Sequence, residues 1–170
     1  QASLNIADDP ELMDLMYKAG CRGVFIGFES SNPEDLKEIR KKQNANVDYE
    51  QIVRTLHLHK LAVVASCILG LDHQGRDYPD QLINDLKKMQ VDFVRVFLMT
   101  SWPGTPLNRQ LKKQDRLIED WDRTRKDIPN ILYKHFTHEE IIAARQHIMS
   151  SFFHVNNMLR IIRRWLFTDR

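Results

Sequence analysis

The chain has 170 residues, 42% of them hydrophobic, which is enough to bury the core of a single globular domain. Its 25 basic and 23 acidic residues give a formal net charge of +2, so the strong positive field of a typical nucleic-acid-binding protein is missing and no nucleic-acid partner is expected. Cys21 and Cys67 are the only cysteines, and their wide separation argues against a disulfide framework or a zinc site and favours a reducing, cytoplasmic location. Because position 1 is Gln, we expect the chain to be a fragment or a processed product of a longer one.

The first hundred residues alternate between helical and strand patterns. Short apolar runs bounded by glycine and polar residues are typical of strands buried on both faces of a parallel sheet. Capping residues mark the helix starts, as at Asp9, Asn32 and Asp48. Helices are predicted at residues 10–19, 33–42, 47–60 and 77–89, and strands at residues 23–28, 61–71 and 91–100. This alternation predicts an α/β fold of βα units with parallel strands and right-handed crossovers.

The pattern changes after Thr100. Residues 102–106 (WPGTP) form a rigid loop, and no convincing strand-like run follows it. Thr137 and Glu140 form a capping-box signature, which predicts one long helix that ends near Phe167. We therefore divide the chain into a sheet-bearing part, residues 1–105, and a helical extension, residues 106–170, that packs on it.

Polar groups follow each predicted strand. In parallel α/β folds, ligands bind at the carboxyl ends of the strands, because the loops there vary while the sheet holds them in place. Three such ends can be read, at residues 27–31, 66–72 and 100–106, and each joins glycine or proline with acidic or hydroxyl groups. This composition indicates a polar, hydroxyl-bearing ligand laid across the strand ends.

Glu29 is the sharpest candidate among these residues. A carboxylate at a strand end can accept hydrogen bonds from both hydroxyls of a ribose or pair with an ammonium group, and Gly27 would allow close backbone approach. An equally acceptable interpretation is that Glu29 caps the helix at Pro33 or pairs with a nearby lysine. For Asp72, ordinary loop chemistry is the favoured interpretation.

Five segments, in this order, resemble a known enzyme family. Residues 1–7 (QASLNIA), 27–30 (GFES), 68–72 (ILGLD) and 103–107 (PGTPL) resemble the later half of the radical S-adenosylmethionine (SAM) barrel. Residues 115–122 (DRLIEDWD) resemble the start of the helical extension behind that barrel in the branch that carries a cobalamin-binding domain upstream. The resemblance implies a partial parallel (β/α) barrel, in an enzyme whose 4Fe-4S cluster reductively cleaves SAM. It also implies cobalamin-dependent methyl transfer to an unreactive carbon of a small-molecule or lipid substrate.

The resemblance also implies which residues bind SAM. Glu29 and Ser30 correspond to the residues beside the ribose and methionine end of SAM. Ile68 and Gly70 correspond to the residues beside the adenine, although Ala65 stands where the first glycine of that pattern would be. The implied cofactor-binding residues are Gly27, Glu29, Ser30, Ile68, Gly70 and Thr100, the last of which closes the end of the final strand together with the loop at residues 103–106.

One element of the family pattern is absent. The family binds its cluster through a C-x-x-x-C-x-x-C motif, and this chain has only Cys21, after a predicted helix, and Cys67, inside a predicted strand. The cluster ligands, any cobalamin domain and the docking site of an electron donor are therefore expected outside this chain, which by itself should be inactive. The alternative is a non-catalytic α/β remnant or binding module that has lost the cluster motif.

Two further features have simpler interpretations. His57 and His59 are two residues apart on a helix and point to different faces, so we assign them to surface and packing roles and expect no metal site. The segment 148–170 combines an apolar stripe with several arginines, namely Arg160, Arg163, Arg164 and Arg170. A terminal helix packed on the barrel explains this pattern, and peripheral contact with an anionic membrane is the alternative. The open sheet edge of a half-barrel should make the isolated chain prone to aggregate.

Overall fold

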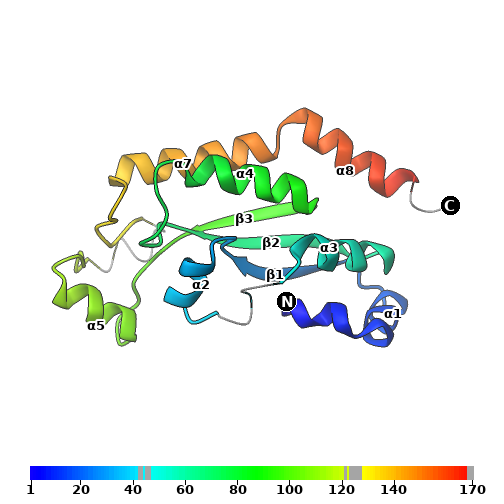
Figure 1. The fold of residues 1–170 in the computed structure, drawn as a ribbon, viewed down its shortest axis with the longest axis horizontal. Helices are drawn as coiled ribbons and strands as arrows, with labels where there is room; N and C mark the ends of the chain where they lie inside the picture. Colours follow the sequence, from blue (N-terminus) through cyan, green and yellow to red (C-terminus); the bar gives the residue numbers. More distant parts are fainter. Residues whose placement is uncertain (42–43, 45–46, 121, 123–127, 168–170) are drawn as a thin grey trace.

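The computed structural model describes residues 1–41, 44, 47–120, 122 and 128–167. At its centre is a three-stranded parallel sheet of β1 (Gly23–Glu29), β2 (Ala62–Leu69) and β3 (Phe93–Leu98), arranged in chain order (Figure 1). The strands alternate with helices, which confirms the predicted α/β fold and its parallel strands.

Helices precede the first strand, connect the strands and follow the last one. Within the described residues these are the 3-10 helix η1 (Leu4–Asp8) and the α-helices α1 (Pro10–Lys18), α2 (Pro33–Glu38), α3 (Tyr49–Leu58), α4 (Tyr78–Met89), α5 (Pro106–Lys113), α7 (His138–Phe152) and α8 (Val155–Phe167). The caps predicted at Asp9, Asn32 and Asp48 each accept a hydrogen bond from a backbone N–H in the first turn of α1, α2 and α3. The capping box at Thr137 and Glu140 is complete.

The prediction of one long helix up to Phe167 is wrong, because the chain turns between α7 and α8. Phe152 is fully buried at the end of α7, and the side-chain amide of Asn157 donates to the Phe152 carbonyl over 2.7 Å. This bond satisfies a carbonyl that the end of a helix leaves without an intrahelical partner. No glycine or proline marks the turn in the sequence.

Helix α2 also ends earlier than predicted. It stops at Glu38, because Arg40 adopts a left-handed backbone with φ 59° and the Lys41 N–H returns to the Leu36 carbonyl over 2.7 Å. The predicted end at Lys42 lies outside the described residues.

The two faces of the sheet have different surroundings. The buried face carries apolar residues such as Val63, Ala65 and Leu69, and helix α3 packs against β2 while α7 packs against α4 and β3. The opposite face, which we call the open face, consists of the residues that alternate with these. It carries Phe25, Gly27 and Glu29 from β1, Val64, Ser66 and Ile68 from β2, and Phe93, Arg95 and Phe97 from β3.

A buried carboxylate fixes α8 to the sheet. Asp92 lies just before β3 with its side chain fully buried, and it accepts hydrogen bonds from the His57 ring, the Val63 N–H, the Arg164 guanidinium and the Trp165 indole. The predicted packing role of His57 is therefore confirmed. His59 pairs with a different carboxylate, Asp14.

The outward side of α8 is mostly apolar. Ile161 and Asn157 are buried, whereas the exposed residues include the apolar Val155, Leu159, Ile162, Leu166 and Phe167 together with Asn156 and Arg163. None of the described helices has the length and apolar character needed to cross a bilayer. Arg170 lies outside the described residues.

Candidate functional site

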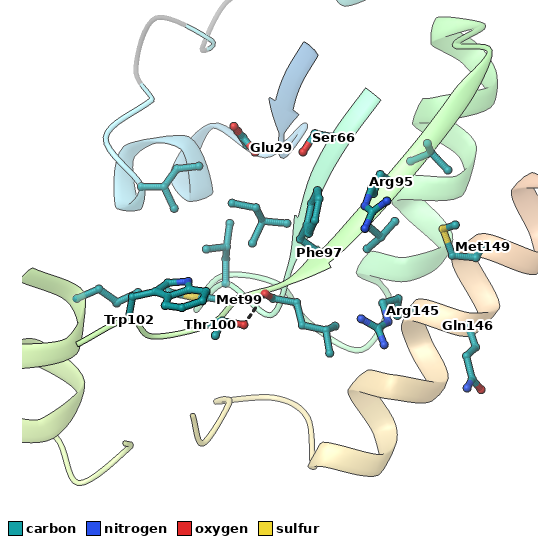
Figure 2. A pocket seen from close by; sticks show the side chains of 17 residues that line it. Glu29, Ser66, Arg95, Phe97, Met99, Thr100, Trp102, Arg145, Gln146 and Met149 are labelled. Carbon is teal, nitrogen blue, oxygen red and sulfur yellow. Dashed lines mark hydrogen bonds between the residues drawn. The ribbon is translucent and has the colours of Figure 1, made fainter. Parts of the chain in front are cut away.

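A large cleft runs beside β3 toward the carboxyl ends of the strands. Its volume is about 990 Å³, at the upper end of the range for small-molecule sites. The lining comes from β2, β3, the loop after β3 and α7, and Glu29 reaches it from the end of β1 (Figure 2). The structure therefore brings two of the three predicted strand ends to one cleft, together with Glu29 from the third.

Glu29 occupies this position at the cost of backbone strain. Its φ is 68°, in the left-handed region that residues other than glycine rarely adopt, and the register of β1 against β2 shifts between Gly27 and Glu29. The strain amounts to about 1–3 kcal/mol at such a residue and occurs most often at functional sites. Asn44 supports the shifted backbone, since its amide donates to the Gly27 carbonyl over 3.0 Å.

The Glu29 carboxylate lies over Gly27. A Cβ atom at position 27 would overlap Glu29 Oε1, so only glycine permits this side-chain position. Lys41 Nζ lies 3.3 Å from the same oxygen, while the Lys41 side chain is 40% exposed and the Glu29 side chain 15%. Glu29 therefore pairs with a lysine, as one interpretation of the sequence expected. It does not cap α2, because Asn32 does so.

A second hollow meets the cleft at Glu29. It has a volume of about 730 Å³ and lies between the N-terminal residues 1–5 and the group Gly27, Glu29 and Lys41. Ala2 forms an isolated parallel bridge to Ile26, so the N-terminal segment lies along the free edge of β1. The Glu29 carboxylate therefore faces two adjoining spaces.

Ser30 lies outside both hollows. It is 1% exposed, and its hydroxyl donates to Asp35 over 2.6 Å and lies 3.0 Å from the Tyr78 hydroxyl. Burial is the main cause that raises the pKa of Tyr78. The predicted contact of Ser30 with SAM stays a prediction, while its observed bonds hold the turn after β1 against α2 and α4.

The same buried network reaches the loop after β2. The Gln74 amide is fully buried, donates to Asp35 over 3.0 Å, and accepts from the Gly70 and Leu71 N–H groups. Asp35, Gln74 and Tyr78 were not predicted as site residues, and no motif distinguishes them in the sequence. They fix the ends of β1 and β2 relative to each other.

The other predicted site residues divide into two groups. Ile68 and Thr100 line the cleft, and the Thr100 hydroxyl donates to the Leu98 carbonyl over 3.0 Å. Gly70 has φ 104° and is enclosed by Tyr133 and Ile141, away from the cleft lining. Its predicted contact with adenine stays a prediction.

The loop after β3 closes one end of the cleft. The Thr105 hydroxyl caps α5 and donates to the Trp102 carbonyl over 2.7 Å, so it fixes the turn. The Trp102 side chain lines the cleft and is 57% exposed (Figure 2).

The Asp72 carboxylate is bound by two basic side chains of the same chain. Arg116 donates to both of its carboxylate oxygens, over 2.9 and 2.7 Å, and Lys134 lies 2.8 Å away. Burial raises the pKa of Asp72, but the hydrogen bonds from Arg116 and Lys134 outweigh it and hold the pKa below its ordinary value. Asp72 thus ties the loop after β2 to the helical extension.

The described residues do not fit an iron–sulfur cluster. No group of three metal-binding side chains occurs among them. Cys67 is fully buried on the helix-covered side of the sheet, and burial raises the pKa of its thiol to about 12, which opposes the thiolate form that binds iron. Cys21 precedes β1 in the chain, and its thiol donates a hydrogen bond to the Gly23 carbonyl over 3.3 Å.

The fold and the cleft define an α/β protein with a cavity of small-molecule size beside its last strand, toward the carboxyl ends of parallel strands. The chain is similar to bacteriochlorophyllide d C-12(1)-methyltransferase of Chlorobaculum tepidum, with 34% identity over 121 residues, which cover 71% of this chain and 26% of that enzyme. It is also similar to hopanoid C-2 methylase of Rhodopseudomonas palustris, with 29% identity over 160 residues, which cover 94% of this chain and 29% of that enzyme.

A third relative is the anaerobic magnesium-protoporphyrin IX monomethyl ester cyclase of Cereibacter sphaeroides, with 24% identity over 115 residues, which cover 68% of this chain and 19% of that enzyme. The chain thus spans less than a third of the length of these three relatives. No protein-family model matches it.

Proposed function

We propose that this chain is the SAM-binding part of a radical SAM methyltransferase that acts on a hydrophobic polycyclic substrate. Support comes from two relatives whose names describe methylation, one of a bacteriochlorophyllide and one of a hopanoid. The in-order family segments of the sequence support the radical SAM class and its cobalamin branch. A partial barrel agrees with a sheet in which the strands follow chain order without reversal.

The observation that carries the proposal is the strained Glu29 at the junction of two hollows. A carboxylate held there can accept hydrogen bonds from both hydroxyls of a ribose. Because Gly27 lacks a side chain, a ligand can also approach the backbone of β1 closely. In this role Lys41 holds the carboxylate in place when no ligand is bound and moves aside when the ribose binds.

The remaining cleft residues supply an apolar surface for the rest of the cofactor and the substrate. Ile68 and Phe97 are Cα partners across β2 and β3, and both line the cleft. An adenine can lie on such a surface, and the Trp102 loop can cover it from the end of β3. These residues bind and orient, and they exclude water from the reacting groups.

The electron-transfer part of the reaction is assigned to other parts of the protein. When bound, a 4Fe-4S cluster would supply the electron that cleaves SAM, and cobalamin would carry the methyl group. Neither cysteine of this chain is placed to hold a cluster, so no step of the proposal uses one. An electron donor for the cluster is part of the same proposal.

The test is titration of the full-length protein with SAM. Glu29→Gln keeps the shape of the side chain and removes its charge, so the lost hydrogen bonds should cost about 1.5–3 kcal/mol, or about 10- to 150-fold in Kd. Glu34→Gln is the matched control, because Glu34 is an exposed acid on α2 that pairs with Lys37. An unchanged Kd for Glu29→Gln, measured by calorimetry on a folded variant, would contradict the site assignment.

A further inference from the structure

The open face of the sheet carries a cation that the SAM site does not use. Arg95 lies at the middle of β3, opposite Ser66 of β2, and Ser66 lies opposite Gly27 of β1. Ser66 is small and leaves space beside the guanidinium, while the Glu29 carboxylate lies over Gly27 at the far end of this row. Arg95 points into the cleft in Figure 2 and is among its lining residues.

Arg95 has aromatic neighbours and no acidic partner in the described part of the chain. Its guanidinium carbon lies 5.2 Å from the centre of the Phe97 ring, and no described carboxylate pairs with it. Phe93 and Phe97 flank it on the same face and are 46% and 38% exposed. Exposed aromatic surface around a single guanidinium suits a flat apolar molecule that bears one anionic group.

The position of Arg95 separates it from the SAM residues. Glu29 lies at the carboxyl end of β1, whereas Arg95 lies two strands away and three residues before the end of β3. In the register of the sheet Glu29 lies level with Cys67 and Val96, so Arg95 is one residue from that row, and the two strand spacings between β1 and β3 amount to about 10 Å. A second molecule bound beside SAM would therefore meet Arg95 on its own side of the cleft.

We propose that Arg95 is a substrate-contacting, specificity-determining residue that binds a carboxylate of a polycyclic acid, whose ring system lies against Phe97 and Trp102. This inference rests on the proposed function and names the class of substrate. Arg145 of α7 also lines the cleft, so the described ionisable residues of its lining are two arginines and Glu29. Lys41 lies beside Glu29, so the guanidinium of Arg95 is the charge of the lining that this proposal offers to an anion.

A simpler role for Arg95 is protection of an edge strand, because β3 has no further strand beside it among the described residues. In that role any charged or polar residue at position 95 suffices, and the protein would bind a polycyclic acid and its ester equally well. The two roles therefore differ in a binding measurement.

The experiment uses the full-length protein loaded with its cofactors and two probes, a chlorophyllide and the methyl ester of its propionate. Binding is followed by absorption and fluorescence titration, and SAM affinity is measured on the same preparations. We expect the wild type to prefer the acid by about tenfold or more. Arg95→Gln should weaken acid binding by about 10- to 100-fold and leave ester and SAM binding unchanged.

Two more variants sharpen the result. Arg95→Lys keeps the charge and loses the planar two-donor geometry, so it should retain part of the acid preference. Arg54→Gln removes an exposed arginine of α3, on the helix-covered side of the sheet, and should change nothing.

Three outcomes would overturn the proposal. The first is equal wild-type affinity for acid and ester, and the second is that neither probe binds while SAM does. The third is weakened SAM binding in Arg95→Gln, which would assign Arg95 to the SAM carboxylate. Failure of SAM binding in the wild type would instead reject the proposed function, so the two failures can be told apart.

Discussion

The substitution Asp92→Asn tests how the C-terminal helix is held. The carboxylate is fully buried and accepts four hydrogen bonds, two at each oxygen: His57 Nε2 and the Val63 N–H at 2.8 Å each, and Arg164 Nη1 and Trp165 Nε1 at 2.9 Å each. An amide of the same shape has only one acceptor oxygen. Whichever way it is turned, two of the four donors meet an NH₂ group instead of an oxygen.

The magnitude follows from burial. The side chains of Arg164 and His57 are 15% and 13% exposed, so neither can be fully resolvated once the carboxylate is gone. Removing one partner of a buried ion pair costs about 3–5 kcal/mol. For a chain of this size, that free energy corresponds to a fall in Tm of roughly 10 °C.

The assay is urea unfolding followed by tryptophan fluorescence, with hydrogen exchange to locate the change. Because Trp165 donates to Asp92, it reports directly on this contact, and the amides of α8 should exchange fastest in the variant. Asp80→Asn is the control, because Asp80 forms a carboxylate–histidine pair of the same 2.8 Å length with His147, but on the surface. A loss below about 1 kcal/mol in Asp92→Asn would refute the reasoning.

The pH dependence has a definite sign. Burial raises the pKa of Asp92, but the hydrogen bonds from His57, Val63 and Trp165 outweigh it and hold the pKa below its ordinary value. A lowered carboxyl pKa gives stability that is present above the unfolded-state pKa of about 3.9 and is lost as the pH falls through the folded-state pKa. The difference in unfolding free energy between wild type and Asp92→Asn should therefore shrink only below about pH 4.

Three more predictions concern other parts of the molecule. Gly70→Ala should lower stability by about 2–4 kcal/mol in thermal melts, because φ is 104° and the new Cβ would lie 2.5 Å from the Tyr133 ring. Gly104→Ala, where φ is 81° and the space is open, should lower stability less, and an equal loss of stability in the two variants would contradict the clash. A thiol reagent should modify one cysteine of the folded chain and two in denaturant, because burial raises the pKa of Cys67 to about 12; two reactive thiols in the folded chain would show that β2 opens. Co-sedimentation with anionic vesicles tests the membrane alternative for α8: that alternative requires Leu159→Glu to release the protein and Leu58→Glu on α3 to leave it bound, whereas a helix that only packs on the sheet gives no retention of the wild type.

Much of the fold could be predicted because its signals are local. The three strands lie within the predicted runs or within one residue of them, and the helix caps at Asp9, Asn32, Asp48 and Thr137 form the expected bonds. Strand hydrophobicity and capping depend on neighbours a few residues apart, so one sequence is enough to reveal them.

The site was only partly predictable, because its geometry depends on long-range contacts. The sequence placed Glu29 at a strand end, but nothing in it indicates the left-handed backbone or the support from Asn44. The family resemblance predicts that Ser30 contacts SAM. In the structure its hydroxyl forms hydrogen bonds with Asp35 and with Tyr78, which lies 48 residues further along the chain. Hydrogen bonds of this kind become visible only when distant segments are placed side by side.

The two ends of the sheet are fixed by separate polar networks, and this arrangement explains which charged groups remain for a ligand. Asp92 holds α8 near the start of β3, and Asp35 with Gln74 joins the ends of β1 and β2. Both carboxylates are fully buried, and Asp92 accepts hydrogen bonds at both oxygens while Asp35 accepts them at Oδ2, so both belong to the folded framework. Glu29 and Arg95 differ, because they lie on the open face, where their contacts are an exposed lysine and an aromatic ring. Exchanging such contacts for a ribose or a carboxylate disturbs no buried group, and the hydrogen-bonded sheet between Glu29 and Arg95 keeps the two residues at a constant separation.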